Sequence, residues 1–490
     1  MQEKSNIASY RKIVKGTSIF GGVQVFNILI ILIRGKFIAL LLGSAGMGYS
    51  SLLQSTTTMV QQLVCLGLNL PAVKDISQAY EANDIKRLSF IIKVFRRLLI
   101  ITGILGAFIL IVFSKYLSKF AFGDSSHYLA FILLSLMLFF TILASGESAV
   151  LQGCRKLKLL AISTLCGSIV GLIIGVPLYY FLGVNGIVPA MIILALSTYL
   201  FNKYHSSKLK IENVSATFNS SYSLGKEMVA LGSVSMISSF IGSASIYILN
   251  TFVSNFGNIS DVGLFQAASS ITNQYVGIVF AAMAVDYFPR LAAVANDETK
   301  MHLLVNQQSE IVVLIITPLV ILLIITAPVL VRILLSSEFT SVIPIMRWMG
   351  LGILFKSVSY PMGYISFSKG DRKTFFLLEG IVGNIIVLSI NIVCYLVWGI
   401  VGLGVSFLLS YIIVLLVYTI VVRAKYNFHH TFSFYKLFIQ SFVLCFLAFI
   451  LSFYDVIVIE LIILLICITI SYKALDKRLD IKSIFISKFK

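Results

Sequence analysis

The chain has 490 residues, of which 58% are hydrophobic and only 12% are charged. A soluble domain carries about 25% charged residues, so this composition excludes a soluble globular protein and indicates a polytopic membrane protein. The formal net charge is nevertheless +18, so the placement of the basic residues bears on both topology and function.

Apolar segments long enough to cross a bilayer follow one another along the chain. About 20 apolar residues span the hydrocarbon core as a helix, and backbone groups in lipid must be satisfied within each helix or in a closed barrel. We therefore predict an all-α integral membrane protein with about 14 transmembrane helices. The predicted spans are 14–42, 47–70, 89–113, 128–152, 159–181, 185–204, 227–254, 262–288, 310–335, 343–367, 374–397, 400–422, 435–453 and 456–474.

Basic residues alternate between the two sides of these spans. The N-terminus, the connections after even-numbered spans and the C-terminus together hold 31 Lys and Arg residues, whereas the other side holds Lys115, Lys119 and Arg332. Because cytoplasmic connections are enriched in Lys and Arg, this bias predicts that both termini lie in the cytoplasm.

An internal repeat relates the first six spans to the next six. Positions about 216 residues apart match in chain order: Ile100–Thr102 recurs as Ile315–Thr317, and Gly183 recurs as Gly399. An even number of spans gives both halves the same orientation, so we expect two six-helix lobes with a binding site between them near the midplane.

The repeat also predicts the domain boundaries. The first lobe is expected over 1–204, a cytoplasmic linker over 205–226 and the second lobe over 227–424. Two extra helices and a basic tail are expected over 425–490.

Signatures of enzymes and metal sites are missing from the sequence. The six cysteines form no CxxC pair, the five histidines form no HExxH, and neither GxxxxGK[ST] nor GxSxG occurs. We therefore expect no catalytic residues, no metal, no nucleic-acid partner and no cofactor other than a coupling proton or sodium ion.

The remaining four basic residues lie in predicted spans: Arg34 and Lys36 in the first, and Arg347 and Lys356 in the tenth. Charges in the hydrocarbon core are costly and are functional candidates by default. Neither Arg34 nor Lys356 has an acidic neighbour three or four residues away, which favours an anionic ligand such as a phosphate. The alternative, above all for Lys36 and Arg347, is that the side chain reaches the lipid headgroups.

Polar side chains form a stripe in the second span and in its repeat partner, the eighth. Two matched stripes are typical of cavity walls that hydrogen-bond sugar hydroxyls, although hydrogen bonding between helices is a close alternative. The residues concerned are Gln54, Thr58, Gln61, Gln266, Ser270 and Asn273.

Carboxylates occur toward the cytoplasmic ends of the spans, at Glu147, Asp286 and Glu379. Such groups bind a coupling ion, or they pair with basic residues such as Arg290 and Arg155 as a gate. Pairing is the more common outcome, so ion coupling is the minor alternative at each position.

Several short motifs occur in a recognisable order. They are Gly16–Ser18, Arg34–Lys36, Gly46–Gly48, Gly67–Asn69, Gln152-Gly153, Asp286–Leu291 and Lys369–Asp371. With the repeat and the two extra helices, they make the chain resemble the Wzx-type O-antigen flippases of the multidrug/oligosaccharidyl-lipid/polysaccharide exporter superfamily. The resemblance covers most of residues 10–425.

The resemblance implies that two lobes alternate between inward-open and outward-open states. It also implies a substrate, a polyprenyl-pyrophosphate-linked oligosaccharide of O-antigen or a related surface glycan, that moves to the periplasmic leaflet of a bacterial inner membrane. Arg34, Lys36 and Lys356 fit the cationic cavity of that family, although the second lobe reads Tyr247–Asn250 where Arg34 would recur. Membrane lipids and other glycan-assembly membrane proteins are the implied partners.

Two rival functions remain at this stage. A cation-coupled multidrug exporter of the same superfamily would place carboxylates deep in its cavity, whereas the deep charges here are basic. A membrane glycosyltransferase or glycan polymerase is disfavoured because the longest outer connection has only about fourteen residues.

Overall fold

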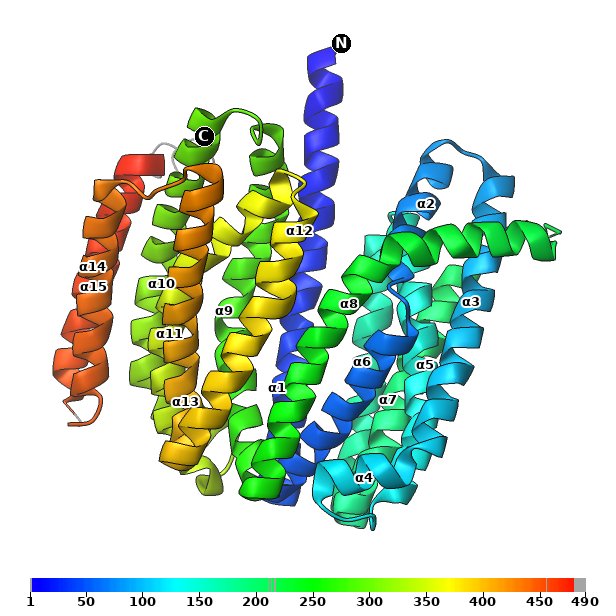
Figure 1. Cartoon of the computed structure of the whole chain (residues 1–490), viewed down its shortest axis with the longest axis horizontal. Helices are drawn as coiled ribbons and strands as arrows, with labels where there is room; N and C mark the ends of the chain where they lie inside the picture. The colour runs from blue at the N-terminus through cyan, green and yellow to red at the C-terminus, as the bar shows by residue number, and fades with distance from the viewer. Residues whose placement is uncertain (1, 210, 213, 216, 455, 480–490) are drawn as a thin grey trace. The chain divides into compact units, whose positions relative to one another are not determined.

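The computed structural model consists of helices joined by connections without strands in its described residues (Figure 1). Those residues are 2–209, 211, 212, 214, 215, 217–454 and 456–479. They contain no strand, and ten helical stretches among them are long and apolar enough to cross a membrane. The expectation of an all-helical membrane protein is confirmed.

Three of the ten stretches are bent or folded back at a glycine. Gly43, Gly183 and Gly399 all have φ between 57° and 65°, a conformation that favours glycine. Beyond Gly399, a Cβ on Gly402 would lie 2.0 Å from the carbonyl oxygen of Cys394, eight residues earlier. Eight residues of continuous helix span about 12 Å, so the chain turns back here. The prediction of fourteen spans counts the segments before and after each of these glycines separately. The number fourteen stays a prediction.

The same turn occurs twice, 216 residues apart. Gly183 has φ 57° and ψ −134°, and Gly399 has φ 58° and ψ −143°. A Cβ on Gly186 would lie 2.1 Å from the carbonyl oxygen of Leu178, as Gly402 lies against Cys394. The backbone therefore supports the internal repeat.

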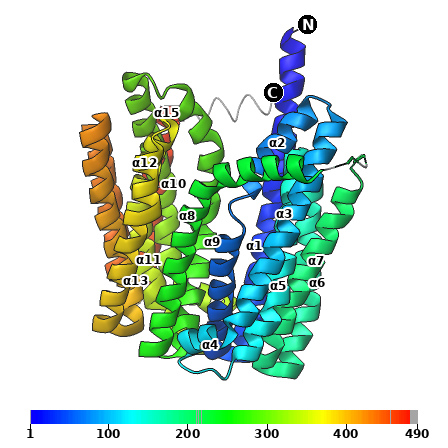
Figure 2. The ribbon, with the colours of Figure 1, turned by 45° about the vertical axis from the view of Figure 1, so that its right-hand side comes forward.

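Packing divides the chain into unit one, Met1–Gly263, and unit two, Leu264–Lys490. In unit one, α5 packs against α3 and α7, α6 packs against α7, and α1 packs against α6 and α8 (Figures 1 and 2). Its helices are α1 (Gln2–Val64), α2 (Asn69–Glu81), α3 (Ile85–Val112), α4 (Ser114–Phe122), α5 (Tyr128–Gly153), α6 (Leu157–Leu182), the 3-10 segment η1 (Gly183–Gly186), α7 (Ile187–Ser207) and α8 (Phe218–Phe256). The internal repeat assigns α8 to the second lobe, whereas packing places α8 in unit one. The predicted lobe boundaries at 204 and 226 stay a prediction.

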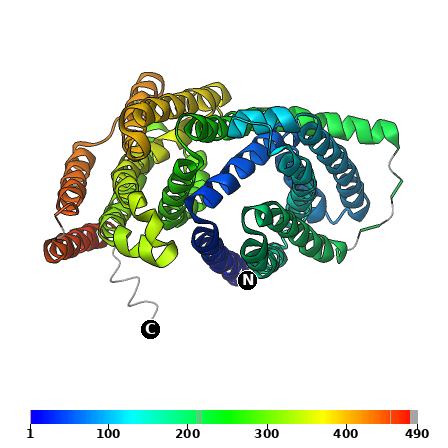
Figure 3. The ribbon, with the colours of Figure 1, turned by 90° about the horizontal axis from the view of Figure 1, so that it is seen from below.

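In unit two, α11 packs against α10 and α13, and the two C-terminal helices pack against α10. Figure 3 shows those two helices, in orange and red, at the edge of this unit. The segments are α9 (Ile259–Ala293), which begins in unit one, α10 (Glu298–Leu334), η2 (Ser337–Ser341), α11 (Val342–Ser368), α12 (Arg372–Phe375), the π-helical η3 (Phe376–Val382), α13 (Gly383–Tyr426), α14 (Phe432–Leu451) and α15 (Ile457–Leu479).

Glycine contacts fix both ends of the part of α1 that follows Gly43. A Cβ on Gly48 would lie 1.9 Å from the carbonyl oxygen of Ile259, and one on Gly263 would lie 1.9 Å from that of Ser44. At the other end, a Cβ on Gly67 would lie 2.2 Å from the carbonyl oxygen of Gly232 in α8. The backbones touch at both ends because these positions carry no side chain.

Candidate functional site

Lys356 lies among aromatic rings inside unit two. From the middle of α11, its Nζ lies 5.5 Å from the ring centre of Phe280 in α9 and 5.3 Å from that of Tyr411 in α13. Tyr360, one turn further along α11, packs its ring 5.0 Å from Phe280. Among the described residues no carboxylate pairs with Lys356. Aromatic faces attract an ammonium and hold it in place without neutralising its charge.

Arg347 does not join Lys356, although both lie on α11. Nine residues at 100° each amount to two and a half turns, so the two side chains leave opposite faces of the helix. The guanidinium of Arg347 lies 5.4 Å from the ring of Phe453, beyond the end of α14. The two cations therefore belong to different surroundings.

Arg34 and Lys36 lie half-buried on the part of α1 that precedes Gly43. Arg34 is close enough to the hydroxyl of Tyr179, a buried residue of α6, to act on it electrostatically. Lys36 lies two residues further along and so points about 200° away around the helix. The two side chains therefore leave α1 in different directions.

The predicted polar stripes lie on α1 and α9. Gln54 donates to the hydroxyl of Thr58 at 3.3 Å, and that hydroxyl donates to the carbonyl of Gln54 at 2.7 Å. Gln54 is exposed, while Thr58 and Gln61 are half-buried. On α9, Gln266 and Asn273 are exposed and Ser270 is half-buried. The residues of both stripes are thus exposed or half-buried.

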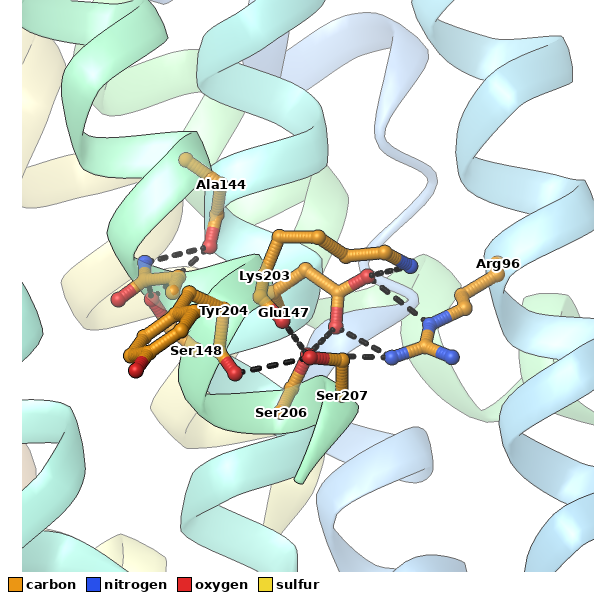
Figure 4. Close-up of polar contacts among 9 residues, drawn as sticks. Arg96, Ala144, Glu147, Ser148, Lys203, Tyr204, Ser206 and Ser207 are labelled. Atoms are coloured by element: carbon orange, nitrogen blue, oxygen red, sulfur yellow. Dashed lines mark hydrogen bonds and ion pairs between the residues drawn. The ribbon is translucent and has the colours of Figure 1, made fainter. Parts of the chain in front are cut away.

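Glu147 is buried at the centre of a charged cluster in unit one (Figure 4). Arg96 of α3 donates to both carboxylate oxygens, at 2.9 and 2.7 Å. Lys203 of α7 donates at 2.9 Å, and Ser206 donates at 2.5 Å. Two cations at this range repel a third, so the geometry favours pairing over ion coupling at Glu147. Asn202 ties α7 to α5 nearby by donating to the hydroxyl of Ser148 at 2.8 Å.

Sequence reasoning missed the partners of Glu147. The sequence places Arg96 and Lys203 among the cytoplasmic basic residues, and it offers Arg155 as a candidate partner. Arg155 instead pairs with Glu81 at the end of α2. The signal that could have found Arg96 is its place beyond the first turns of α3, eleven residues from the start of that helix.

Glu379 lies in different surroundings in unit two. It projects from the π-helical segment, and a Cβ on Gly363 would lie 2.8 Å from its Oε1. The hydroxyl oxygen of the buried Tyr418 would lie 3.7 Å from the same Cβ, and within the described residues no basic side chain pairs with Glu379. Single π-helical turns are frequent at functional sites. Glu379 is therefore the better placed of the two carboxylates for a small cation.

The remaining predicted gate residues lie near the end of α9. The side chain of Asp286 lies outside the described residues. Arg290 is exposed in the last turn of α9. No metal-binding group of three or more His, Cys, Asp or Glu occurs in the described part of the chain.

A second charged cluster caps α12 in unit two. Asp371 pairs with Lys425, accepts from the hydroxyl of Tyr426 at 2.7 Å and accepts from the backbone N–H of Thr374 at 3.1 Å. The hydrogen bond from Lys425, followed by that from Tyr426, holds the pKa of Asp371 below its usual value. The cluster joins the connection after α11 to the end of α13.

We expect Asp371→Ala to destabilise the protein by about 1–2 kcal/mol at neutral pH, because a helix cap and a charged hydrogen bond are lost. Since the folded-state pKa is lowered, the stabilisation is present above the unfolded-state pKa of about 3.9 and is lost as pH falls through the folded-state value. Melting temperatures of the purified proteins from neutral to acid pH check this.

Asp84→Ala is the matched control, since Asp84 caps α3 through the N–H of Arg87 at 2.9 Å. Asp84→Ala should lose only the free energy of the helix cap, and it should therefore destabilise the protein less than Asp371→Ala does. The role given to Lys425 and Tyr426 would be contradicted if Asp371→Ala lost no more stability than Asp84→Ala. It would also be contradicted if the loss of stability in Asp371→Ala were undiminished at acid pH.

Comparison with known proteins shows the family of this chain and the solved structures that have a similar fold. The sequence profile described as polysaccharide biosynthesis protein matches residues 37–344. A protein named Lipid III flippase from Escherichia coli (strain K12) is 19% identical over 358 residues, which are 71% of this chain and 83% of that protein.

Two solved structures share the fold. An inward-facing multidrug resistance MATE family transporter of the MOP superfamily has a TM-score of 0.71 at 16% identity, covering 81% of this chain and 94% of that one. Lipid II flippase MurJ in an inward closed conformation has a TM-score of 0.71 at 16% identity, covering 94% and 99%. Because the profile match spans more than half of its residues, the chain belongs to the polysaccharide biosynthesis protein family.

Proposed function

We propose that this protein is a flippase for a polyprenyl-pyrophosphate-linked oligosaccharide, an O-antigen or related surface-glycan repeat unit. The observation that carries the proposal is Lys356, an ammonium inside a candidate membrane span that has aromatic neighbours and no carboxylate partner among the described residues. In a family tied to polysaccharide biosynthesis, a pyrophosphate is the anion that such a cation would bind. The relatives named as lipid III and lipid II flippases support the same class of substrate.

Lys356 and Arg34 would bind the pyrophosphate, because an ammonium or guanidinium makes strong charge-assisted hydrogen bonds to phosphate oxygens. The rings of Phe280 and Tyr411 would exclude water around Lys356, and a drier site strengthens its attraction for the anion. The accessible polar stripes of α1 and α9 would hydrogen-bond the sugar hydroxyls while the prenyl chain stays in lipid.

The sequence has no ATPase motif, so we propose that a proton or sodium gradient drives transport, with Glu379 as the candidate carboxylate. We further propose a bacterial inner membrane, with both termini in the cytoplasm and the substrate moving to the periplasmic leaflet. Labelling the variant Asp124→Cys with a membrane-impermeant maleimide tests the orientation, because the introduced thiol should react in intact spheroplasts.

Deleting the gene should remove the surface glycan and cause the lipid-linked oligosaccharide to accumulate on the cytoplasmic side. Mass spectrometry of extracted lipid-linked sugars, with and without a sugar-modifying enzyme added to spheroplasts, measures the amount and its side. Expression of the gene from a plasmid is the control. Unchanged glycan and unchanged lipid pools, together with new drug sensitivity, would favour the multidrug exporter instead.

A further inference from the structure

A pocket of about 400 Å³ lies beside the first turns of α3 in unit one. Lys93, Arg96 and Arg97 line it, and their spacing places them on one face of the helix. Ile211 and Glu212, from the connection between α7 and α8, line the opposite wall. The pocket is therefore basic on the side of α3 and closed by a chain segment on the other.

Two hydrogen bonds hold that connection against α3. The Nζ of Lys93 donates to the carbonyl of Val214 at 2.7 Å. The backbone N–H of Glu212 donates to the hydroxyl of Ser89 at 2.9 Å. The wall opposite the basic residues is thus positioned by bonds to the helix that carries them.

Cations outnumber carboxylates among the residues that line the pocket. Its lining holds three cations and one carboxylate, that of Glu212. Arg96 pairs with Glu147, and Glu147 also pairs with Lys203. Like charges one helical turn apart destabilise a helix, and a bound anion would relieve this repulsion. A phosphate group carries matching charge and accepts bidentate hydrogen bonds from arginine.

An exposed apolar stripe continues from the pocket along α3. Ile100, which lines the pocket, is 44% exposed, and Ile104 and Phe108 on the same face are 58% and 61% exposed. From Ile100 to Phe108 the helix rises about 12 Å, close to the roughly 15 Å of one hydrocarbon leaflet. A ligand with a phosphate head and a hydrocarbon chain fits both features at once.

We propose that this pocket binds the phosphate group of a membrane lipid, whose hydrocarbon chain lies along Ile100, Ile104 and Phe108. The lining of this pocket includes neither Lys356 nor Arg34, and the proposal does not depend on the proposed substrate. Lys93 and Arg97 bind the phosphate together with Arg96, whose orientation is fixed by Glu147. Binding is accordingly weakened by salt.

The test uses the purified full-length chain in neutral detergent and fluorescent phosphatidylglycerol as the probe. Lys93→Gln combined with Arg97→Gln should weaken binding about 30-fold, from the usual contribution of a basic residue at a membrane surface. Arg96 is left in place because it pairs with buried Glu147. The control, Lys86→Gln with Arg87→Gln, removes the same charge from the first turn of α3 outside the pocket and should bind as the wild type does. Equal weakening in both pairs would overturn the proposal in favour of general attraction.

A second set of binding measurements distinguishes a lipid ligand from free phosphate. Ile104→Ser should weaken binding of phosphatidylglycerol, whereas Leu133→Ser on the exposed face of α5 should not. Inorganic phosphate should displace the probe only at far higher concentration than unlabelled phosphatidylglycerol. Efficient displacement by inorganic phosphate, with no effect of Ile104→Ser, would overturn the lipid assignment.

Discussion

Replacing Lys356 by Gln should lower transport of the lipid-linked oligosaccharide by about 10- to 100-fold while leaving the protein folded. A charge-assisted hydrogen bond contributes about 1.5–3 kcal/mol, which corresponds to that range. Lys356 is half-buried and has no carboxylate partner among the described residues, so its removal leaves no buried charge behind. Surface glycan and the cytoplasmic pool of lipid-linked sugar in a complemented deletion strain measure the loss.

Arg347→Gln is the matched control on the same helix. It removes the same charge from the opposite face of α11, where the guanidinium packs on Phe453. We expect near-normal transport from this variant, and partial transport from Lys356→Arg because the charge is kept. Equal transport by Lys356→Gln and the wild type, at equal protein levels, would exclude Lys356 from the binding site.

Replacing both Arg96 and Lys203 by Met should destabilise the protein by about 3–5 kcal/mol, because Glu147 would be left as a buried carboxylate without a cation. The side chain of Glu147 is only 5% exposed, so water cannot replace the two partners. Each single Met variant keeps one cation and should lose less. Thermal unfolding of the purified proteins measures these differences.

Adding Glu147→Gln to the double variant should recover most of the lost stability, since the neutral amide removes the buried charge and can still accept from Ser206. This rescue distinguishes charge from packing. If the triple variant is no more stable than the double variant, the loss comes from the missing methylene packing and the electrostatic account is wrong. A triple variant that folds but does not transport would assign Glu147 a functional role as well.

The helical character and the repeat were predictable from the sequence because both rest on local rules. The bilayer fixes the length of an apolar helix, and a positive φ favours glycine, so Gly183 and Gly399 mark equivalent turns. The intramembrane cations were visible for the same reason, since a Lys in an apolar run stands out. Sequence therefore found Lys356 and Arg34 without any knowledge of packing.

The partners of those charges were not predictable. Arg96 and Glu147 lie 51 residues apart, and their meeting depends on α3 and α5 packing side by side. Nor could the sequence show that Lys356 would lie between Phe280 and Tyr411, because that contact joins three helices. The π-helical turn at Glu379 also left no pattern in the residue order.

The glycine contacts of α1 have a consequence for mutational tolerance. At Gly48 and Gly263 even an added methyl group would overlap a carbonyl oxygen, and Gly67 meets the backbone of α8 with a φ of 63°. The distance between these backbones is thus set by main-chain atoms, which every residue shares. Neighbouring side chains on α1 can drift during evolution without altering the spacing. A saturation scan of this part of α1 should therefore show a few intolerant glycines separated by permissive positions.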